Sequence, residues 1–140
     1  GPAERADLRT RLTALRLAEL REGVWLRPAN LTRALPDDLN QVVQRYTVRP
    51  DRPSGELAEA LWPLDAWSAT SRALLAHIAG SPRPADRLTA FAAVVRHLLA
   101  DPVLPPGLLP AGWPGTELRA AYTAYQRELI GEVRARVRGT

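Results

Sequence analysis

The chain has 140 residues, carries a net charge of +4 and contains neither cysteine nor methionine. The absence of cysteine excludes disulfide frameworks, thiolate zinc sites and cysteine nucleophiles, and no apolar run approaches the roughly 20 residues that span a bilayer. All 19 basic residues are arginine. The codon bias of a GC-rich genome is the simpler explanation, and an acidic partner such as DNA or a CoA phosphate is the alternative. We expect a cytoplasmic protein of one compact domain or two small subdomains.

The first part of the chain predicts one helix followed by two short strands. Leucines recur at spacings of four and three in residues 4–21, which indicates a helix. Residues 23–27 and residues 42–49 favour strands, and a proline follows each of them. Turn-forming residues at 51–55 then mark a loop.

The second part predicts three amphipathic helices. Apolar residues recur at helical spacing in residues 64–78, 88–99 and 118–137. A break at residues 80–84 separates the first two helices. Residues 101–115 contain five prolines, so this stretch can be neither a helix nor a central strand.

The proline-rich stretch 101–115 is the most distinctive feature of the sequence. Proline fixes φ, so such a loop loses little entropy when it becomes ordered. Leu104, Leu108, Leu109 and Trp113 would be costly to expose together. We expect a rigid strap folded over the helices, and a pocket wall built partly by Trp113 is the alternative.

No catalytic or metal-binding pattern is present. His77 and His97 do not belong to a metal-binding pair, and the serines have no evident base nearby. We interpret Asp37-Asp38 as helix-start or turn residues rather than metal ligands. We therefore predict that the chain is not an enzyme, with no metal and no cofactor.

Six residues are candidates for contact with a ligand. Arg96, His97 and Trp113 could converge on one cavity, where the arginine would hold a phosphate or a carboxylate. Aromatic side chains could line the same pocket, although a packing role remains open for the histidine and the tryptophans. The candidates are Trp62, Trp67, Arg96, His97, Trp113 and Tyr122.

Three stretches carry a resemblance to a known family. The run DPVLPPGLLPAGWPG at 101–115, followed by a helix with two tyrosines, resembles the C-terminal signature of the PaaX family of transcriptional repressors. LREGVWLRPANL at 20–31 is similar to a strand of that family, and LWPLDAW at 61–67 is similar to the segment that leaves its central domain.

The resemblance implies a fold. Members of the family have an N-terminal winged helix-turn-helix, a central ferredoxin-like domain similar to small CRISPR-associated nucleases, and a helical C-terminal domain. For this chain it implies an α+β, mostly α fold. A truncated ferredoxin-like α-β-β part at 3–55 lacks its first strand, and a helical domain at 56–140 follows. Gly1-Pro2 is typical of a protease scar, so we expect a fragment without the winged helix.

The resemblance also implies a function. The chain would be the effector-sensing and dimer-forming region of a bacterial repressor of aromatic catabolism. It would respond to an aromatic acyl-CoA or a related ligand such as an aromatic acid, and a winged helix absent from this chain would bind operator DNA. The expected assembly is a homodimer without membrane contact. A protein-interaction module without a small ligand, a direct nucleic-acid-binding domain and a residual nuclease remain alternatives.

Overall fold

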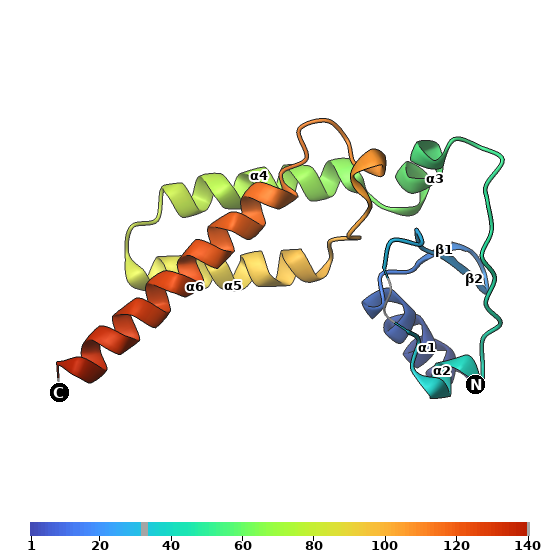
Figure 1. The fold of residues 1–140 in the computed structure, drawn as a ribbon, viewed down its shortest axis with the longest axis horizontal. Coiled ribbons are helices and arrows are strands. Elements are labelled where there is room, and N and C mark those ends of the chain that lie inside the picture. The colour runs from blue at the N-terminus through green and yellow to red at the C-terminus, as the bar shows by residue number, and fades with distance from the viewer. Residues whose placement is uncertain (32–33, 140) are drawn as a thin grey trace. The chain divides into compact units, whose positions relative to one another are not determined.

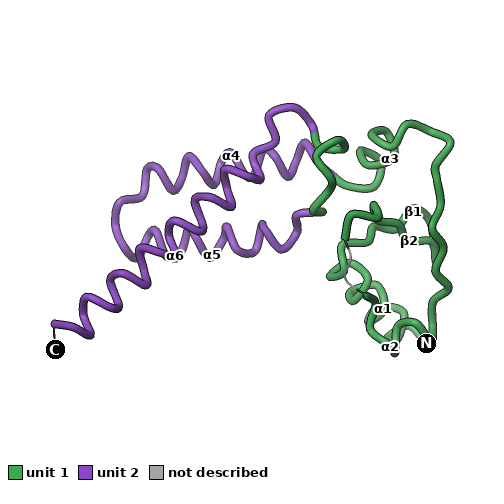
Figure 2. Tube along the Cα trace, viewed as in Figure 1, with its two compact units in different colours: residues 1–62, 102–109 green, residues 63–101, 110–140 purple. Residues whose placement is uncertain are grey.

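The structure is a computed structural model that describes residues 1–31 and 34–139. These residues form six α-helices, one 3₁₀ turn and one two-stranded antiparallel sheet, which confirms the expected α+β, mostly α class. By its internal contacts the chain divides into two compact units (Figure 2). Unit 1 comprises Gly1–Trp62 and Pro102–Leu109, and unit 2 comprises Pro63–Asp101 and Pro110–Thr140.

Unit 1 begins with helix α1, Pro2–Ala14, followed by the hairpin of β1, Ala18–Arg21, and β2, Val24–Leu26. Arg9 connects the helix to both strands. Its guanidinium forms an ion pair with Glu19 of β1 and lies 5.8 Å from the ring centroid of Trp25 in β2. Glu19 and Trp25 are directly opposite each other in the hairpin, so Arg9 contacts both residues of one cross-strand pair.

The rest of unit 1 consists of short elements. Helix α2 spans Asp37–Asn40, α3 spans Ser54–Leu61, and the 3₁₀ turn η1 spans Pro106–Leu108. Asn30 Nδ2 donates to the carbonyl of Val103 at 3.0 Å. The apolar side chains of unit 1 that are buried come from four separate stretches of chain: Leu12, then Leu35 and Leu39, then Ala58, and Leu104.

The predicted helix over residues 4–21 is wrong at its C-terminal end. Helix α1 ends at Ala14, and residues 18–21 form β1 instead. Arg16 adopts φ +70°, its N–H donates to the Thr13 carbonyl, and the Leu17 N–H donates to the Leu12 carbonyl. This is the Schellman pattern of helix termination. It is usually marked by a glycine, and here an arginine holds the left-handed position.

The predicted strand over residues 42–49 is also wrong for this structure. Residues 43–50 belong to neither helix nor strand. A strand is defined by its hydrogen-bonded neighbour, and β1 and β2 pair only with each other among the described residues. The other predicted strand, 23–27, is confirmed as β2, Val24–Leu26.

Unit 2 is built from three long helices (Figure 1). Helix α4 spans Leu64–Ala79, α5 spans Pro84–Leu99 and α6 spans Gly115–Arg138. All three helices pack on one another, and the predicted helices over 64–78, 88–99 and 118–137 are confirmed. Their buried cluster consists of Trp67, Phe91, Val94, Leu118 and Tyr125.

The proline-rich stretch is irregular as predicted, apart from η1. It is divided between the units: residues 102–109 belong to unit 1, whereas residues 110–114 lead into α6 in unit 2. Among the residues that the structure describes, no helix combines the length and apolarity that a membrane span requires.

Leu118 provides a test of this packing. It is 0% exposed, so Leu118→Ala should lower the free energy of unfolding by about 2–5 kcal/mol through the cavity it leaves. Leu99 is 69% exposed, so the control Leu99→Ala should change that free energy by no more than about 0.5 kcal/mol. Chemical denaturation measures both. Equal losses would contradict the observed packing of α6.

Candidate ligand-binding site

Three of the six candidate residues form a stack of aromatic rings in unit 2. Trp67 of α4 lies between the other two rings. Its ring centroid is 4.3 Å from that of His97 in α5 and 4.6 Å from that of Trp113 in the proline-rich loop, with interplanar angles of 18° and 11°. The indole Nε1 of Trp67 donates to the His97 carbonyl at 3.1 Å. Both faces of this indole are therefore covered by side chains.

A serine and a histidine meet beside this stack, a contact that the sequence did not indicate. Ser71 Oγ lies 2.8 Å from His97 Nε2 and donates to the Trp67 carbonyl at 2.9 Å. His97 Nε2 is also 3.0 Å from that carbonyl oxygen. Because a carbonyl only accepts, the proton of the ring is favoured on Nε2. Nε2 then cannot accept the serine proton, and Ser71 is 0% exposed. This geometry suits packing rather than nucleophilic catalysis.

The end of the proline-rich loop fixes the position of Trp113. Arg72 Nη2 donates to the Gly112 carbonyl at 2.9 Å, and Gly112 has φ +70°, a conformation that favours glycine. At the first residue of α6, a Cβ on Gly115 would overlap the Trp113 indole Nε1. Trp113 is half-buried and stacks on α4, whereas the sequence favoured a strap that lies over the helices in general.

An ion pair fixes the start of the same loop. Asp101 is 2% exposed, and its carboxylate accepts a hydrogen bond from Arg119 of α6. Together with the contact of Arg72 with Gly112, this pair holds the two ends of the loop to α6 and α4.

The remaining candidates lie apart from the stack. Trp62 is a half-buried residue of unit 1 directly after α3. Arg96 is exposed on α5, and no ion pair links it to any residue that the structure describes. Tyr122 is half-buried on α6. The structure thus brings together Trp67, His97 and Trp113, and it leaves Arg96 free to face solvent.

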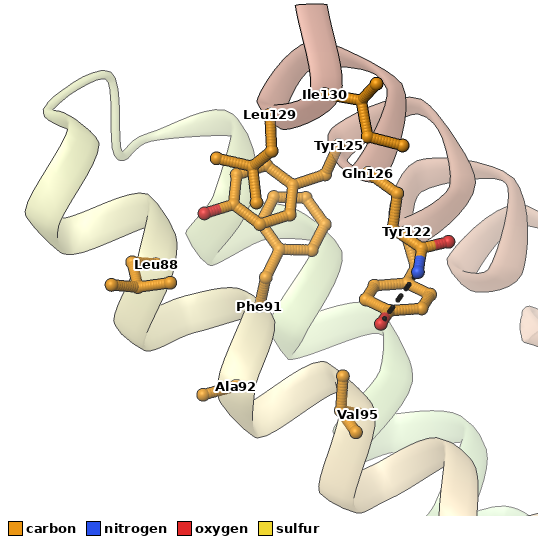
Figure 3. A pocket seen from close by; sticks show the side chains of 9 residues that line it. All are labelled: Leu88, Phe91, Ala92, Val95, Tyr122, Tyr125, Gln126, Leu129 and Ile130. Carbon is orange, nitrogen blue, oxygen red and sulfur yellow. Dashed lines mark hydrogen bonds between the residues drawn. The ribbon is translucent and has the colours of Figure 1, made fainter. Parts of the chain in front are cut away.

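A groove between α5 and α6 is the second notable feature of unit 2 (Figure 3). It encloses about 380 Å³. Phe91 and Tyr125 form part of its wall as stacked rings with centroids 4.0 Å apart. Arg87 lies 5.6 Å from both centroids and pairs with Glu128 at 2.9 Å. The lining residues are Leu88, Phe91, Ala92, Val95, Tyr122, Tyr125, Gln126, Leu129 and Ile130.

Polar atoms lie at one side of this apolar groove. Gln126 Nε2 donates to the Tyr122 hydroxyl at 3.1 Å, as Figure 3 shows. Arg96 is four residues beyond Ala92 on α5, so the two residues share a helix face. Arg96 therefore lies one helical turn beyond the lining residue Ala92. This arrangement, apolar walls with a few polar groups, is typical of small-molecule sites.

The sequence identified only Tyr122 among the groove residues. It assigned Leu88, Phe91, Ala92, Val95, Tyr125 and Leu129 to the apolar stripes of the two helices, and it did not single out Gln126 or Ile130. One signal was available: apolar residues on α6 cover more than one face, and those beyond Tyr125 are substantially exposed. They are Leu129, Ile130, Val133 and Val137. When the apolar stripe of a helix is wider than the part that packs in the core, the excess indicates an additional contact surface.

Asp37 and Asp38 occur at the start of α2, as the sequence predicted. Arg11 Nη1 donates to Asp38 Oδ2 at 2.7 Å, and Nη2 donates to Oδ1 at 3.0 Å. These hydrogen bonds lower the pKa of Asp38. Within residues 1–31 and 34–139, no three histidine, aspartate or glutamate side chains cluster as a metal site would require.

The fold and groove define a class: a helical domain that offers an apolar groove for a ligand or a partner. The family model described as PaaX-like protein C-terminal domain matches residues 62–137, which is more than half of the chain. The chain therefore belongs to the PaaX family, as the resemblance implied. The match includes all of α4, α5 and the proline-rich loop.

A solved structure is similar to this chain in sequence and in fold. The uncharacterized protein Rv0674 from Mycobacterium tuberculosis is similar, with 43% identity and a TM-score of 0.89 over 94% of this chain. The chain covers 56% of that protein, so it spans little more than half of that protein's length. The comparison with curated proteins found no match.

A substitution at Gly115 tests the position of Trp113. Gly115→Ala should displace the indole, because the new methyl group would occupy its place beside α6. We expect a lower melting temperature and a shifted tryptophan emission. The control Gly131→Ala adds a methyl group where nothing lies within 4 Å and should not lower stability. Equal behaviour of the two variants would contradict the observed stack.

The pair of Arg11 and Asp38 predicts a pH effect. The folded-state pKa of Asp38 lies below its ordinary value, so the pair stabilises the fold at neutral pH. That contribution is lost as the pH falls through the lowered pKa. Arg11→Gln should raise the pKa of Asp38 toward its ordinary value, and Arg5→Gln should leave it unchanged. NMR titration of the carboxyl group measures both, and identical curves for wild type and Arg11→Gln would show that the pair does not form.

Proposed function

We propose that this chain is the effector-sensing region of a transcriptional regulator of the PaaX type. The match over residues 62–137 supports the family, and the groove between α5 and α6 is the observation that carries the sensing role. In this proposal operator DNA is bound by a winged helix outside the chain. The regulator acts as a homodimeric repressor of aromatic catabolism in the cytoplasm, where its DNA lies.

The groove suits an aromatic acyl-CoA. Its walls are apolar, and its volume of about 380 Å³ falls within the range of ligand sites, about 300–1,000 Å³. The aryl group would lie against the Phe91 and Tyr125 rings. Tyr122 and Gln126 would hydrogen-bond the thioester, and Arg96 would pair with a phosphate of the CoA.

This site differs in part from the one that the sequence indicated. Tyr122 and Arg96 keep their proposed roles. Trp67, His97 and Trp113 would act indirectly, because their rings already cover one another. We propose that the stack positions α5 against α4 and so holds one wall of the groove. Trp62 remains a candidate in unit 1.

The proposed mechanism is a population shift. In this mechanism α5 and α6 exist in an equilibrium between two spacings, and a ligand between them binds one spacing more tightly than the other. The ligand shifts the equilibrium only by this difference in affinity. Helix α6 is joined through Arg119 to Asp101 at the start of the loop. A movement of α6 would therefore move the loop, whose residues 102–109 belong to unit 1.

The domain division is part of this proposal. We assign residues 3–55 to a partial ferredoxin-like domain and residues 56–140 to the helical domain. We also propose that the chain is not an enzyme. The Ser71–His97 contact supports this, because the ring proton on Nε2 leaves no base for the hydroxyl.

A protein-interaction module is the second candidate. The exposed apolar residues at the end of the groove and beyond it on α6 favour it: Ile130, which also lines the groove, Val133 and Val137 are 52%, 60% and 69% exposed. They lie at spacings of three and four, which forms one stripe on a helix. Such a stripe is suited to a helical partner.

Calorimetric titration with phenylacetyl-CoA tests the sensing role. Wild type should bind, and Arg96→Ala should bind about tenfold or more weakly, because a charge-assisted hydrogen bond contributes about 1.5–3 kcal/mol. Tyr122→Phe should reduce binding by a smaller factor. The melting temperature of Arg96→Ala should equal that of wild type, since its side chain is exposed.

Arg83→Ala is the matched control. It removes the same charge from the residue before α5, about 20 Å from Arg96 along the helix. It should bind like wild type. No heat of binding from wild type, across aryl-CoA thioesters and free aromatic acids, would reject the sensor and leave the interaction module.

A further inference from the structure

The C-terminal end of α6 extends beyond the helices that pack against it. Phe91 stacks on Tyr125, and Arg87 pairs with Glu128, so α5 and α6 run antiparallel. Helix α5 begins within one turn of Arg87, whereas α6 continues for ten residues after Glu128. Figure 1 shows this end of α6 projecting past the connection between α4 and α5. The last buried residue of α6 is Tyr125, so about three turns of the helix are available for a contact outside the bundle.

One side of this projecting end is apolar and exposed. Ile130, Val133 and Val137 follow one another at spacings of three and four and are 52%, 60% and 69% exposed. Gln126, four residues before Ile130, begins the same row. Alternating spacings of four and three residues are those of the a and d positions in a pair of helices. We call this row, Gln126, Ile130, Val133 and Val137, the α6 seam.

Arginines flank the α6 seam on both sides. At about 100° of rotation per residue, Arg127 and Arg134 lie roughly 70–90° to one side of the seam, and Arg136 lies roughly 90° to the other. All three side chains are exposed, and no ion pair joins them to a residue in the described part of the chain. The two acids of this end, Glu128 and Glu132, lie roughly 130–170° from the seam, on the outer side of the helix.

We propose that the α6 seam binds an acidic amphipathic helix of a partner protein. The apolar stripe of the partner covers the seam, and aspartates or glutamates beside that stripe pair with the flanking arginines. In helix pairs the charges beside the apolar row determine the choice of partner and its orientation. A contact of about three turns is short, so the complex is weak and depends strongly on these charges.

A second copy of the chain fits this surface less well than an acidic helix. Two α6 seams in contact would bring six arginines together, three from each copy, and neither copy has an acid at the flanks of its seam. Like charges that face each other across an interface oppose association. An acidic helix instead presents carboxylates to the guanidinium groups, which can bind them through two parallel hydrogen bonds.

The residue types of the α6 seam also favour a helix over a lipid surface or a nucleic acid. Helices that lie on membranes carry Trp, Phe or Leu on the inserted face, whereas the seam beyond Gln126 consists of isoleucine and valine. These β-branched residues are typical of seams between helices. A nucleic-acid backbone would pair with the arginines but would leave the apolar row facing phosphates.

This inference rests on the interaction-module candidate and assigns a chemistry to its partner. It needs no effector, because Arg127, Val133 and Arg134 do not line the groove. Variants at these positions should therefore bind phenylacetyl-CoA as wild type does. A failed effector titration would remove the sensor and leave the α6 seam, whereas a failed peptide titration would remove the seam and leave the sensor.

Two synthetic peptides test the charge selection. Each is a three-heptad helix with isoleucine at a and leucine at d; the acidic peptide carries glutamate at e and g, and the basic peptide carries lysine there. Fluorescence anisotropy of the labelled peptides measures their binding to the chain. The acidic peptide should bind about tenfold or more tightly than the basic peptide, and its affinity should fall as the salt concentration rises.

Charge reversal should exchange this preference. Arg127→Glu/Arg134→Glu should bind the acidic peptide about tenfold or more weakly than wild type, and the basic peptide more tightly. Arg5→Glu/Arg45→Glu is the matched control, because it makes the same change in net charge at two exposed arginines of unit 1. It should retain the wild-type preference for the acidic peptide.

A second pair of variants tests the apolar contact. Val133→Ser should weaken binding of the acidic peptide, because it places a hydroxyl in the middle of the α6 seam. Ala135→Ser introduces the same side chain on the outer side of the helix and should bind the peptide like wild type. Both positions are exposed, so both variants should melt close to the wild-type temperature.

The intact regulator proposed above should bind the acidic peptide as tightly as the chain does. Much weaker binding by the intact regulator would mean that one of its own segments covers the α6 seam, and this result would overturn the proposal.

Four further results would contradict it. Equal binding of the two peptides would remove the charge selection, and equal losses in the two double variants would show attraction by net charge alone. Sedimentation in which wild type self-associates and Val133→Ser does not would assign the seam to a second copy. Binding to phosphatidylglycerol vesicles that Val133→Ser abolishes, without binding of either peptide, would assign it to a membrane.

Discussion

The stack around Trp67 determines how the three helices of unit 2 are assembled. Its indole is 6% exposed, with His97 on one face and Trp113 on the other, and its only polar atom donates to the His97 carbonyl. One side chain of α4 is thus bound to α5 by stacking and by a backbone contact, and to the loop that starts α6. Stacked aromatic pairs contribute about 0.5–1.5 kcal/mol beyond the area that they bury. The groove depends on this arrangement, because α5 supplies one wall and α6 the other.

Much of the fold could be predicted from local pattern. The three helices of unit 2 follow from apolar spacing, and the loop follows from its prolines, because both signals act within a few residues. The end of α1 could not be predicted in this way. Helix termination at Arg16 uses a left-handed residue without the glycine that usually marks it. The strand predicted over 42–49 failed for a different reason. Its residue pattern is that of a strand, but a strand also needs a neighbouring strand to pair with, and the local sequence pattern carries no information about that neighbour.

The candidate site was predicted less well, for a reason of helix geometry. Arg96 and His97 are adjacent in sequence, and both were predicted to lie at one cavity. Consecutive residues of an α-helix are rotated by about 100°, so they do not face the same way. His97 contacts Trp67, and Arg96 is exposed. The contact of Ser71 with His97 joins residues 26 positions apart, and no local pattern in either helix records it.

The division of the proline-rich loop has a consequence for the order in which the protein is made. Residues 1–62 leave the ribosome before residues 63–109, but unit 1 also needs residues 102–109, including the buried Leu104. Helices α4 and α5 are synthesised in between. Unit 1 therefore cannot complete its core during its own translation and must wait until most of unit 2 has emerged. The later unit can begin to fold before the earlier one is finished, which reverses the usual N-terminal-first sequence of folding on the ribosome.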